Sequence, residues 1–380
     1  MAAHKENVEV YWYLTAPDGR SPWSTEGARK IDLPYLRQIA SAVDQLGFTG
    51  ALLATGPHDT WVLGSSLISS TNNMRFLIAV HPPLISPVLA AKMAQTFDDF
   101  SGGRVLLNIV NGNTAQMRAY GSTLGHDERY AYTDEWIQVW KQAVAGESLN
   151  FHGKYITAEG KALQLSSTQK PTPPLWFGGS SQAAHLTAAK HIDTYLSWGE
   201  TPPQVAEKIK DLQALAAEQG RTMRYGIRLY LIVRDTDEEA WQEADRLLKT
   251  MDPHTVEHMQ SVLRNSDSVG QQRMLRNHNG QIPKDARELE IYPDLWAGMS
   301  LVRPGPGTTI VGSPATVLAR LREYQNAGIS TFIFSGVPLL EEAYRVGEYI
   351  LPHLFDNRQA VTTPKQEEQE KVFTWAHNIH

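Results

Sequence analysis

Eight short apolar runs, separated by amphipathic stretches, constrain the fold of this chain more than any other feature of its sequence. Within each run the apolar residues are nearly continuous rather than alternating, which is typical of strands buried on both faces. The eight predicted strands are residues 8–15, 51–55, 74–80, 105–110, 174–179, 194–199, 225–233 and 331–336.

The segments between these runs carry helix signals. Apolar residues recur at three- and four-residue spacing in residues 34–46. Ser313 and Pro314 form an N-cap and first-turn pair, and Gly328 provides a C-terminal stop for a helix over residues 313–327. The other predicted helices are residues 87–100, 133–145, 181–190, 203–219 and 237–249. Repeated strand–helix alternation predicts an α/β fold, a single (β/α)8 TIM barrel over residues 1–355.

Two stretches exceed what a minimal barrel needs. Residues 120–170 extend the middle of the chain and include a predicted β-hairpin around residues 151–154. Residues 251–295 are polar and rich in Gln, Asn, Arg and His. Because long insertions between barrel elements commonly move over the site, we expect a lid there. Residues 356–380 form a predicted polar tail.

Composition excludes several classes of function. The chain has no cysteine, which rules out disulfides, a thiolate nucleophile, iron–sulfur clusters and Cys-ligated zinc. Its net charge of −6 argues against a nucleic-acid partner. No apolar run approaches the roughly 20 residues that span a bilayer, and the polar N-terminus does not resemble a signal peptide. We therefore expect a cytoplasmic protein without membrane partners. The scattered histidines match no metal motif, so no metal site is predicted.

Active sites of such barrels lie at the C-terminal ends of the strands. Gly178-Gly179-Ser180-Ser181 follow a predicted strand and precede a helix, whose N-terminus offers free N–H groups to a phosphate. An ordinary N-cap turn explains these four residues equally well. The HDERY segment that ends at Tyr130 could donate to the same phosphate, although taken alone it is better explained as a solvated surface.

Two arginines stand where charge is costly. Arg228 lies in the middle of an otherwise apolar predicted strand, and Arg303 lies between Val302 and a Pro/Gly run. A buried guanidinium needs an anionic partner. That partner is either a carboxylate of the protein or an anionic ligand. Two arginines suit a sulfonate, phosphate or carboxylate better than a neutral molecule.

The sequence is also similar to that of a known family. It resembles the flavin-dependent alkanesulfonate monooxygenases of the bacterial luciferase-like superfamily over roughly residues 10–352. The motifs that carry the resemblance are SGGR at 101–104, FGGSS at 177–181, YLSWGE at 195–200, GIRL at 226–229, DSVGQQRM at 267–274, LWAG at 295–298, LVR at 301–303 and EEAYR at 341–345.

The resemblance implies an insertion-bearing luciferase-like barrel that uses reduced FMN as a co-substrate. A separate NAD(P)H-dependent FMN reductase would supply the reduced flavin. With O2, the enzyme would cleave the C–S bond of an organosulfonate and release sulfite and an aldehyde. The resemblance also implies a homodimer or homotetramer.

Site residues carry over by position. The resemblance implies that FMN is held by the following residues: Asn111, Tyr130, Gly179, Ser180 and Ser181. It implies that Arg228 and Arg303 clamp the sulfonate and that Trp198 borders the flavin or oxygen site. Tyr230 and His58 are candidate proton donors or acceptors, so the candidate catalytic residues are Arg228, Tyr230, Trp198 and His58.

The departures from the family pattern fall at the substrate end. The loop at residues 55–59 is shorter than in the family and has no cysteine, and the family's Arg-Leu-His is replaced by Arg228-Leu229-Tyr230. The family's Ser-Gly-Tyr-Pro-His is replaced by SGVPL at residues 335–339. The loop after the first strand lacks the histidines found in the family. These changes predict an altered substrate, for example a sugar sulfonate such as sulfoquinovose. Three alternatives stay open: a luciferase-like monooxygenase of another sulfur or nitrogen compound, a deazaflavin-dependent reductase, and a flavin-binding protein without turnover. A metal-dependent barrel hydrolase is the remaining, less specific alternative.

Overall fold

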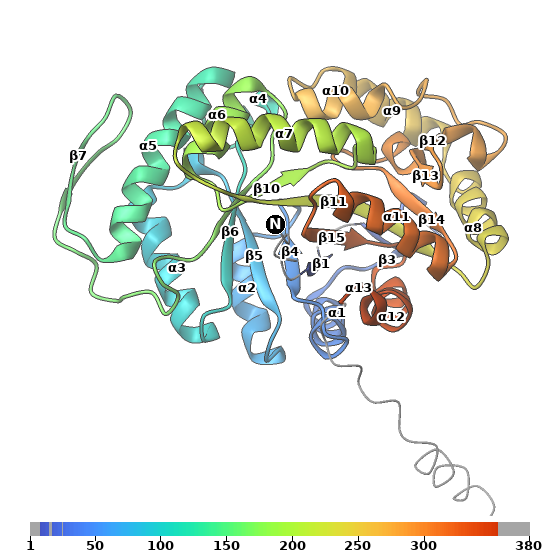
Figure 1. The fold of residues 1–380 in the computed structure, drawn as a ribbon, viewed down its shortest axis with the longest axis horizontal. Coiled ribbons are helices and arrows are strands. Elements are labelled where there is room, and N and C mark those ends of the chain that lie inside the picture. Colours follow the sequence, from blue (N-terminus) through green and yellow to red (C-terminus); the bar gives the residue numbers. More distant parts are fainter. Residues whose placement is uncertain (1–7, 15–16, 25, 356–380) are drawn as a thin grey trace, which may run out of the picture.

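The computed structural model describes residues 8–14, 17–24 and 26–355, and its centre is a closed barrel of parallel strands (Figure 1). Neighbouring strands run in the order β1, β4, β5, β6, β9, β10, β11 and β15, and β15 pairs with β1 to close the ring. Their bounds are β1 Glu9–Tyr13, β4 Gly50–Leu53, β5 Arg75–Val80, β6 Val105–Ile109, β9 Leu175–Phe177, β10 Thr194–Ser197, β11 Arg224–Val233 and β15 Thr331–Ser335. All eight lie on predicted apolar runs, so the (β/α)8 prediction is confirmed.

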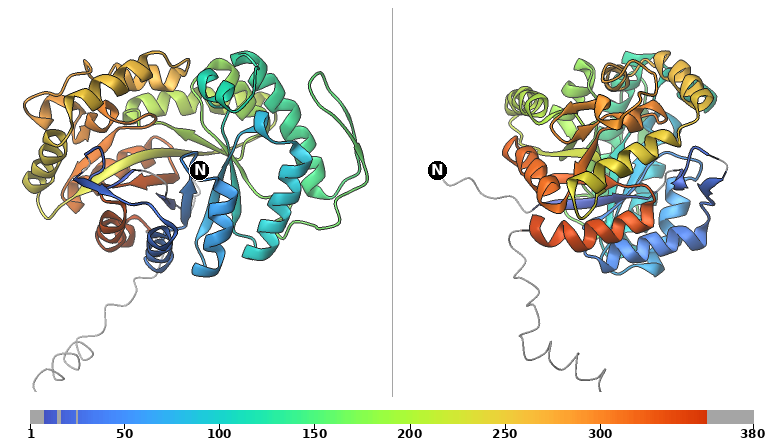
Figure 2. Two further views of the ribbon diagram at one scale, coloured as in Figure 1. Left: turned by 180° about the vertical axis from the view of Figure 1, so that it is seen from behind. Right: turned by 90° about the vertical axis from the view of Figure 1, so that its right-hand side faces the viewer.

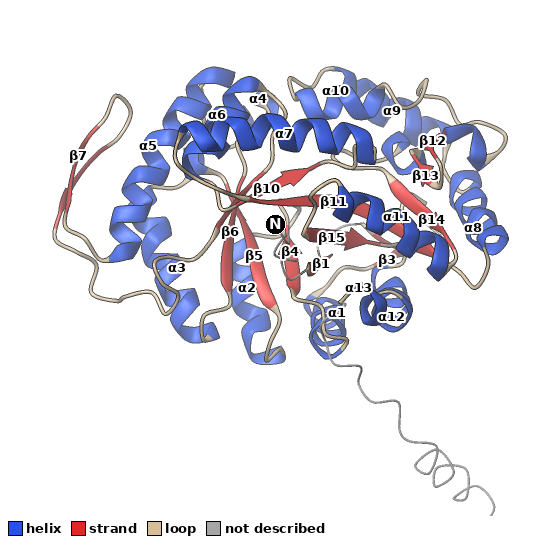
Figure 3. Ribbon diagram, in the orientation of Figure 1, coloured by secondary structure: helices blue, strands red, loops and turns tan. Residues whose placement is uncertain are grey.

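Helices surround the barrel on its outer face (Figures 2 and 3). They are α1 Leu33–Gln45, α2 Thr60–Leu67, α3 Pro87–Ser101, α4 Thr114–Ala119, α5 His126–Ala145, α6 Gln182–His191, α7 Pro202–Glu218, α8 Asp237–Lys249, α9 Pro253–Arg264, α10 Val269–Leu275, α11 Pro314–Asn326, α12 Leu339–Tyr349 and α13 Leu351–Leu354. Short 3-10 helices lie at Ile68–Ser70, Pro82–Leu84, Ala286–Leu289 and Gly298–Leu301. In the described part of the chain, none of these helices is long and apolar enough to cross a membrane.

The predicted helices are confirmed, and local capping explains where two of them begin. The Ser313 side chain accepts a hydrogen bond from the Thr316 N–H at 3.4 Å, and Pro314 starts α11 as predicted. Helix α5 begins earlier than predicted, at His126, because the Glu128 carboxylate accepts from the Gly125 N–H at 2.9 Å. The HDERY segment is therefore the first turn of α5.

Both predicted insertions form defined elements. The hairpin predicted around residues 151–154 is confirmed as β7 (Leu149–His152) and β8 (Thr157–Gly160), which project beyond α5 (Figure 1). Helices α9 and α10 fill much of residues 251–295, and β12 (Glu290–Tyr292) and β13 (Leu295–Trp296) follow. The unpredicted β14 (Thr309–Gly312) joins β13 to β11, so the sheet continues past the closed barrel. The predicted tail at 356–380 lies outside the described residues.

The direction of the β1 side chains sets up the barrel interior. Trp12 packs outward, with its ring 5.5 Å from Phe48. Its neighbours on either side must then face inward, since side chains alternate along a strand. Tyr11 does so, and its ring lies 4.9 Å from Trp176 of β9 on the opposite side of the ring. Tyr13 is the next inward residue, at the C-terminal end of β1.

Candidate active site

Two arginines and two tyrosines meet at the end of the barrel where β1 stops. The guanidinium carbon of Arg228 lies 3.8 Å from the centre of the Tyr13 ring. The guanidinium carbon of Arg303 lies 5.6 Å from the same ring and 5.2 Å from the ring of Tyr230. Register places Tyr230 beside Ser335, at the carboxyl end of β15. The structure thus brings together the predicted Arg228, Tyr230 and Arg303.

These arginines have no acidic partner in the part of the chain that the structure describes. The ionisable groups that shift the pKa of these arginines are Tyr13 and, for Arg303, also Arg228. No carboxylate is among them. Arg228 Nε and Nη2 are buried and lack a hydrogen-bond partner there, as does the Tyr230 hydroxyl. Burial lowers the pKa of Arg303 to about 10, and repulsion from Arg228 adds to this effect. Arg303 therefore stays charged near neutral pH, and a pair of arginines without a carboxylate favours an anion as the missing partner.

Tyr13 is the residue that sequence analysis missed at this site. Its side chain is 5% exposed, and both guanidiniums also approach its hydroxyl. Burial by itself raises the pKa of the phenol, but the two positive charges outweigh burial and hold it below its usual range. The available signal was the alternation of β1: an inward Tyr11 places Tyr13 inward as well.

The predicted phosphate loop lies where β9 passes into α6. The Ser181 side chain caps α6 by accepting from the Ala184 N–H at 3.2 Å. A Cβ on Gly179 would lie 2.7 Å from the Cβ of Ala184, so only glycine allows the loop to approach the helix this closely. The Tyr195 hydroxyl, on β10, donates to the Gly179 carbonyl and so holds the loop in place. The loop can therefore present the helix N–H groups to a phosphate.

Tyr130 and Asn111 complete a second polar group beside this loop. Burial raises the pKa of Tyr130, and the facing Ser181, Arg129 and Asn111 offset that rise in part. Thr133 donates to Asn111 Oδ1 at 2.7 Å, which leaves the buried Asn111 Nδ2 without a partner among the described residues. An unpaired buried donor beside a helix N-terminus suits an acceptor-rich ligand. The residues predicted to hold FMN, namely Asn111, Tyr130 and Ser181, thus lie together and fit that group.

Helix α10 links the two halves of the site. A Cβ on Gly270 would lie 2.9 Å from the indole of Trp198, so this part of α10 rests directly on Trp198. Gln271 Oε1 accepts from the Gly305 N–H at 2.8 Å, two residues beyond Arg303. Asp267, which precedes α10, accepts from Thr114 Oγ1 at 2.5 Å and lies 3.3 Å from Arg129 Nη2. Helix α10 therefore contacts Trp198 and the loop that carries Arg303, and Asp267, just before the helix, binds α4 and α5.

The two histidines near the strand ends differ. His58 is exposed in the turn before α2, where Asp59 caps the helix by accepting from the Val62 N–H. No described contact joins His58 to the arginines. His81 follows β5; its Nδ1 lies 2.7 Å from the Val110 carbonyl, and its buried Nε2 has no partner within the described residues. Burial lowers the pKa of His81, so a neutral imidazole faces the interior. The position of His81 directly after a predicted barrel strand is the sequence signal that could have identified this residue.

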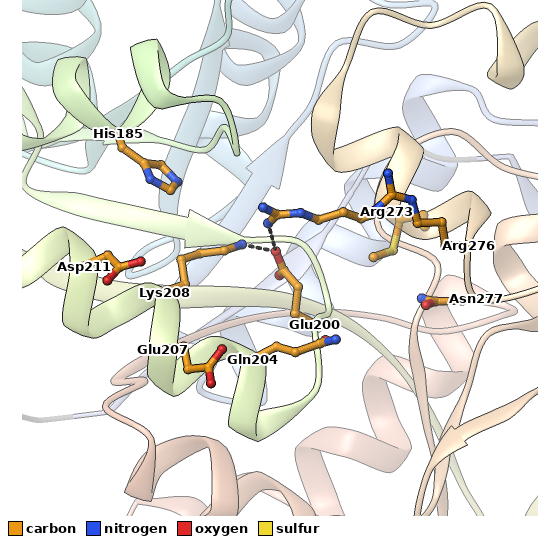
Figure 4. Close-up of a pocket in the computed structure, with 10 residues that line it drawn as sticks. His185, Glu200, Gln204, Glu207, Lys208, Asp211, Arg273, Arg276 and Asn277 are labelled. Atoms are coloured by element: carbon orange, nitrogen blue, oxygen red, sulfur yellow. Dashed lines mark hydrogen bonds and ion pairs between the residues drawn. The ribbon is translucent and has the colours of Figure 1, made fainter.

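A cavity of about 370 Å³ lies beside the phosphate loop, between α6, α7 and α10 (Figure 4). Lys208 and Glu200 form a buried ion pair inside it, and Arg273 of α10 lies 3.6 Å from the same Glu200 oxygen. His185 also lines the cavity, and its Nε2 lies 3.3 Å from the Tyr195 hydroxyl that holds Gly179. Burial, together with the positive charges of Lys208 and Arg273, lowers the pKa of His185 to about 4. No group of three or more metal-ligating side chains forms within residues 8–14, 17–24 and 26–355.

Comparison with known proteins places the chain in a family. Residues 12–331 match the family model described as luciferase-like monooxygenase. A riboflavin lyase solved with modified FMN and riboflavin is 17% identical with a TM-score of 0.75, covering 91% of both chains. EDTA monooxygenase from Chelativorans sp. BNC1 is 18% identical with a TM-score of 0.72, covering 92% of this chain and 94% of that one.

The structural relatives are not all flavin proteins. A coenzyme F420-dependent tetrahydromethanopterin reductase from Methanopyrus kandleri is 17% identical with a TM-score of 0.68, covering 92% of this chain and 99% of that one. At such identities the likeness shows the shared luciferase-like TIM-barrel fold. The match to the family model extends over most of the barrel, from β1 to the start of β15. The chain therefore belongs to the luciferase-like monooxygenase family.

Proposed function

We propose that this protein is a reduced-FMN-dependent monooxygenase that cleaves the C–S bond of an organosulfonate. The observation that carries the proposal is the pair of partly buried arginines, Arg228 and Arg303, whose ionisable neighbours include no carboxylate. A sulfonate presents three oxygens to them, so each guanidinium can donate to the same head group. The sulfonate then fixes the orientation of the carbon that carries it.

The other half of the barrel mouth suits the flavin. Ser180, Ser181 and the α6 N-terminus would hold the FMN phosphate, with Tyr130 beside them, and Asn111 Nδ2 would donate to the flavin. Reduced FMN would supply two electrons and activate O2. One oxygen atom ends in the aldehyde and the other in water, while the sulfur leaves as bisulfite. Helix α10, resting on Trp198, would exclude water from this reaction.

A sulfite-release assay tests this proposal directly. The full chain, FMN, an NADH-dependent FMN reductase and O2 are mixed with sulfonates from methanesulfonate to long alkyl sulfonates and sulfoquinovose. We expect sulfite from at least one member. Arg228→Ala should abolish release, and Arg37→Ala, which changes an exposed arginine of α1, should not. No sulfite from any member, with flavin reduction shown, would overturn the proposal.

Two further arms identify the alternatives. Two partly buried arginines also suit carboxylates, so EDTA and nitrilotriacetate belong in the panel, with O2 consumption and aldehyde as readouts. In a third reaction without O2, reduced coenzyme F420 replaces FMN and a small ketone is supplied as the hydride acceptor. Turnover in that reaction alone would assign the chain to the reductases instead. The supply of flavin by a separate reductase is tested by omitting that enzyme, which should stop turnover.

A further inference from the structure

The position of Tyr13 is not explained by an arginine clamp alone. An apolar residue would suffice to fill the inward position at the end of β1, and a carboxylate would neutralise the arginines permanently. Instead, the phenol of Tyr13 is buried beside the two guanidiniums. The centre of its ring lies 3.8 Å from the guanidinium carbon of Arg228. A phenol is neutral at its ordinary pKa near 10, and nearby positive charges favour its negative form.

Among the residues that the structure describes, the charges that face Tyr13 come from two elements. Arg228 belongs to β11 and Arg303 to the loop before β14. The strands paired with or next to β1 at this point, β4 (GALL) and β15 (TFIFS), carry no ionisable side chain. Tyr230 contributes a second phenol, which lies against Arg303 rather than between the arginines. Tyr13 is therefore the group best placed to balance the positive pair.

We propose that the Tyr13 oxygen is the built-in counter-anion of Arg228 and Arg303, and that it takes up one proton when an anionic substrate group binds between them. The step balances: a phenolate, a proton from solvent and the free anion become a neutral phenol and the bound anion. This inference rests on the proposed function only in requiring an anionic substrate. Its consequence is that substrate binding loads a proton on Tyr13 Oη, beside the head group.

The first test measures tyrosinate in the ligand-free full chain by ultraviolet absorbance as pH rises. We expect one of the 14 tyrosines to ionise well before the others, because the guanidiniums hold the pKa of Tyr13 below its usual range. Tyr13→Phe should remove that early step, and the matched Tyr230→Phe should keep it. An unchanged early step in Tyr13→Phe, or none in the wild type, would contradict the proposal.

The second test measures proton uptake on anion binding. Methanesulfonate and butanesulfonate are titrated calorimetrically at a pH above the midpoint of the early tyrosine step found in the first test, in buffers that differ in ionisation enthalpy. We expect close to one proton taken up per anion and a matching loss of tyrosinate absorbance. Above the pKa of Tyr13, wild-type anion affinity should fall about tenfold for each pH unit, whereas Tyr13→Phe should stay nearly flat.

The outcomes separate this inference from the proposed function. Binding of either sulfonate without proton uptake overturns the role of Tyr13, even if sulfite is released in the activity assay. Proton uptake by wild type and its absence in Tyr13→Phe support the role, even if no sulfonate is turned over. The wild-type titration decides the matter by itself should Tyr13→Phe fail to fold, which circular dichroism would reveal.

Discussion

At the scale of single residues, the site combines charges that a stable core would avoid. Arg228 and Arg303 lie near each other around one phenol, and each lacks a carboxylate. Sequence analysis found both because an arginine inside an apolar run is conspicuous. It missed Tyr13 because a tyrosine in the apolar run EVYWY looks like any core aromatic. The position of the Arg228 guanidinium over the Tyr13 ring is what distinguishes Tyr13 from Tyr11.

The lack of a carboxylate partner predicts a conflict between stability and activity at Arg228. Arg228→Met keeps the long side chain, removes a partly buried charge that has no carboxylate partner and leaves Tyr13 as a neutral phenol, so we expect the free energy of unfolding to rise by about 1 kcal/mol or more. The same change should eliminate turnover of an anionic substrate. Thermal unfolding and the sulfite assay measure the two effects. Arg228→Lys keeps the charge and should not stabilise; a lower melting temperature for Arg228→Met would contradict the argument.

At the scale of elements, strands were easier to predict than the helices that follow some of them. The barrel strands are short, apolar throughout and separated by helical patterns, so their number and order were evident. Helix α2 was missed because its sequence, TWVLGSSL, is short and carries no polar face. Strand β14 was missed because it sits outside the eight-fold repeat, where no periodicity marks it. The contacts of α10 depend on residues far apart in sequence and were not predictable.

The attachment of α10 predicts how that helix responds to change at Asp267. Its carboxylate binds Thr114 and Arg129, and these partners outweigh burial and hold the pKa of Asp267 below its usual range. Asp267→Asn should therefore increase amide hydrogen exchange in residues 267–276 several-fold and raise the KM for reduced FMN. Glu257→Gln changes an exposed residue of α9 and is the matched control.

The sign of the pH effect follows from the same shift. A carboxylate whose folded-state pKa is lowered stabilises the contact fully above its unfolded value, near 3.9, and loses that effect as pH falls through the lower folded value. Exchange in wild-type α10 should thus be independent of pH near neutrality, after correction for intrinsic rates. Equal exchange in Asp267→Asn and wild type would show that other contacts hold α10.

At the scale of the whole molecule, the barrel separates the two arginines from the residues predicted to hold the flavin. Strands β1 and β11 and the loop before β14 carry Tyr13, Arg228, Tyr230 and Arg303, and β6 and β9 lead into the residues predicted to hold the flavin. In the closed ring of eight, β6 lies opposite β15 and β9 lies opposite β1, as the Tyr11–Trp176 contact across the interior shows. This layout followed from the strand order, which the sequence alternation predicted. The expected homodimer or homotetramer remains a prediction, which light scattering of the full chain would test.

The opposite placement predicts that the two ligands respond independently to mutation. Arg303→Ala should weaken binding of a sulfonate at least tenfold, because a charged partner is lost, and leave FMN affinity within about twofold. Asn111→Leu removes the unpaired buried donor and should weaken FMN binding while leaving sulfonate affinity unchanged. Calorimetry for the anion and flavin fluorescence measure the two affinities in each variant and in the double variant. Additive losses in the double variant fit two separate half-sites, whereas a strong coupling between Arg303 and Asn111 would mean that both residues contact one ligand.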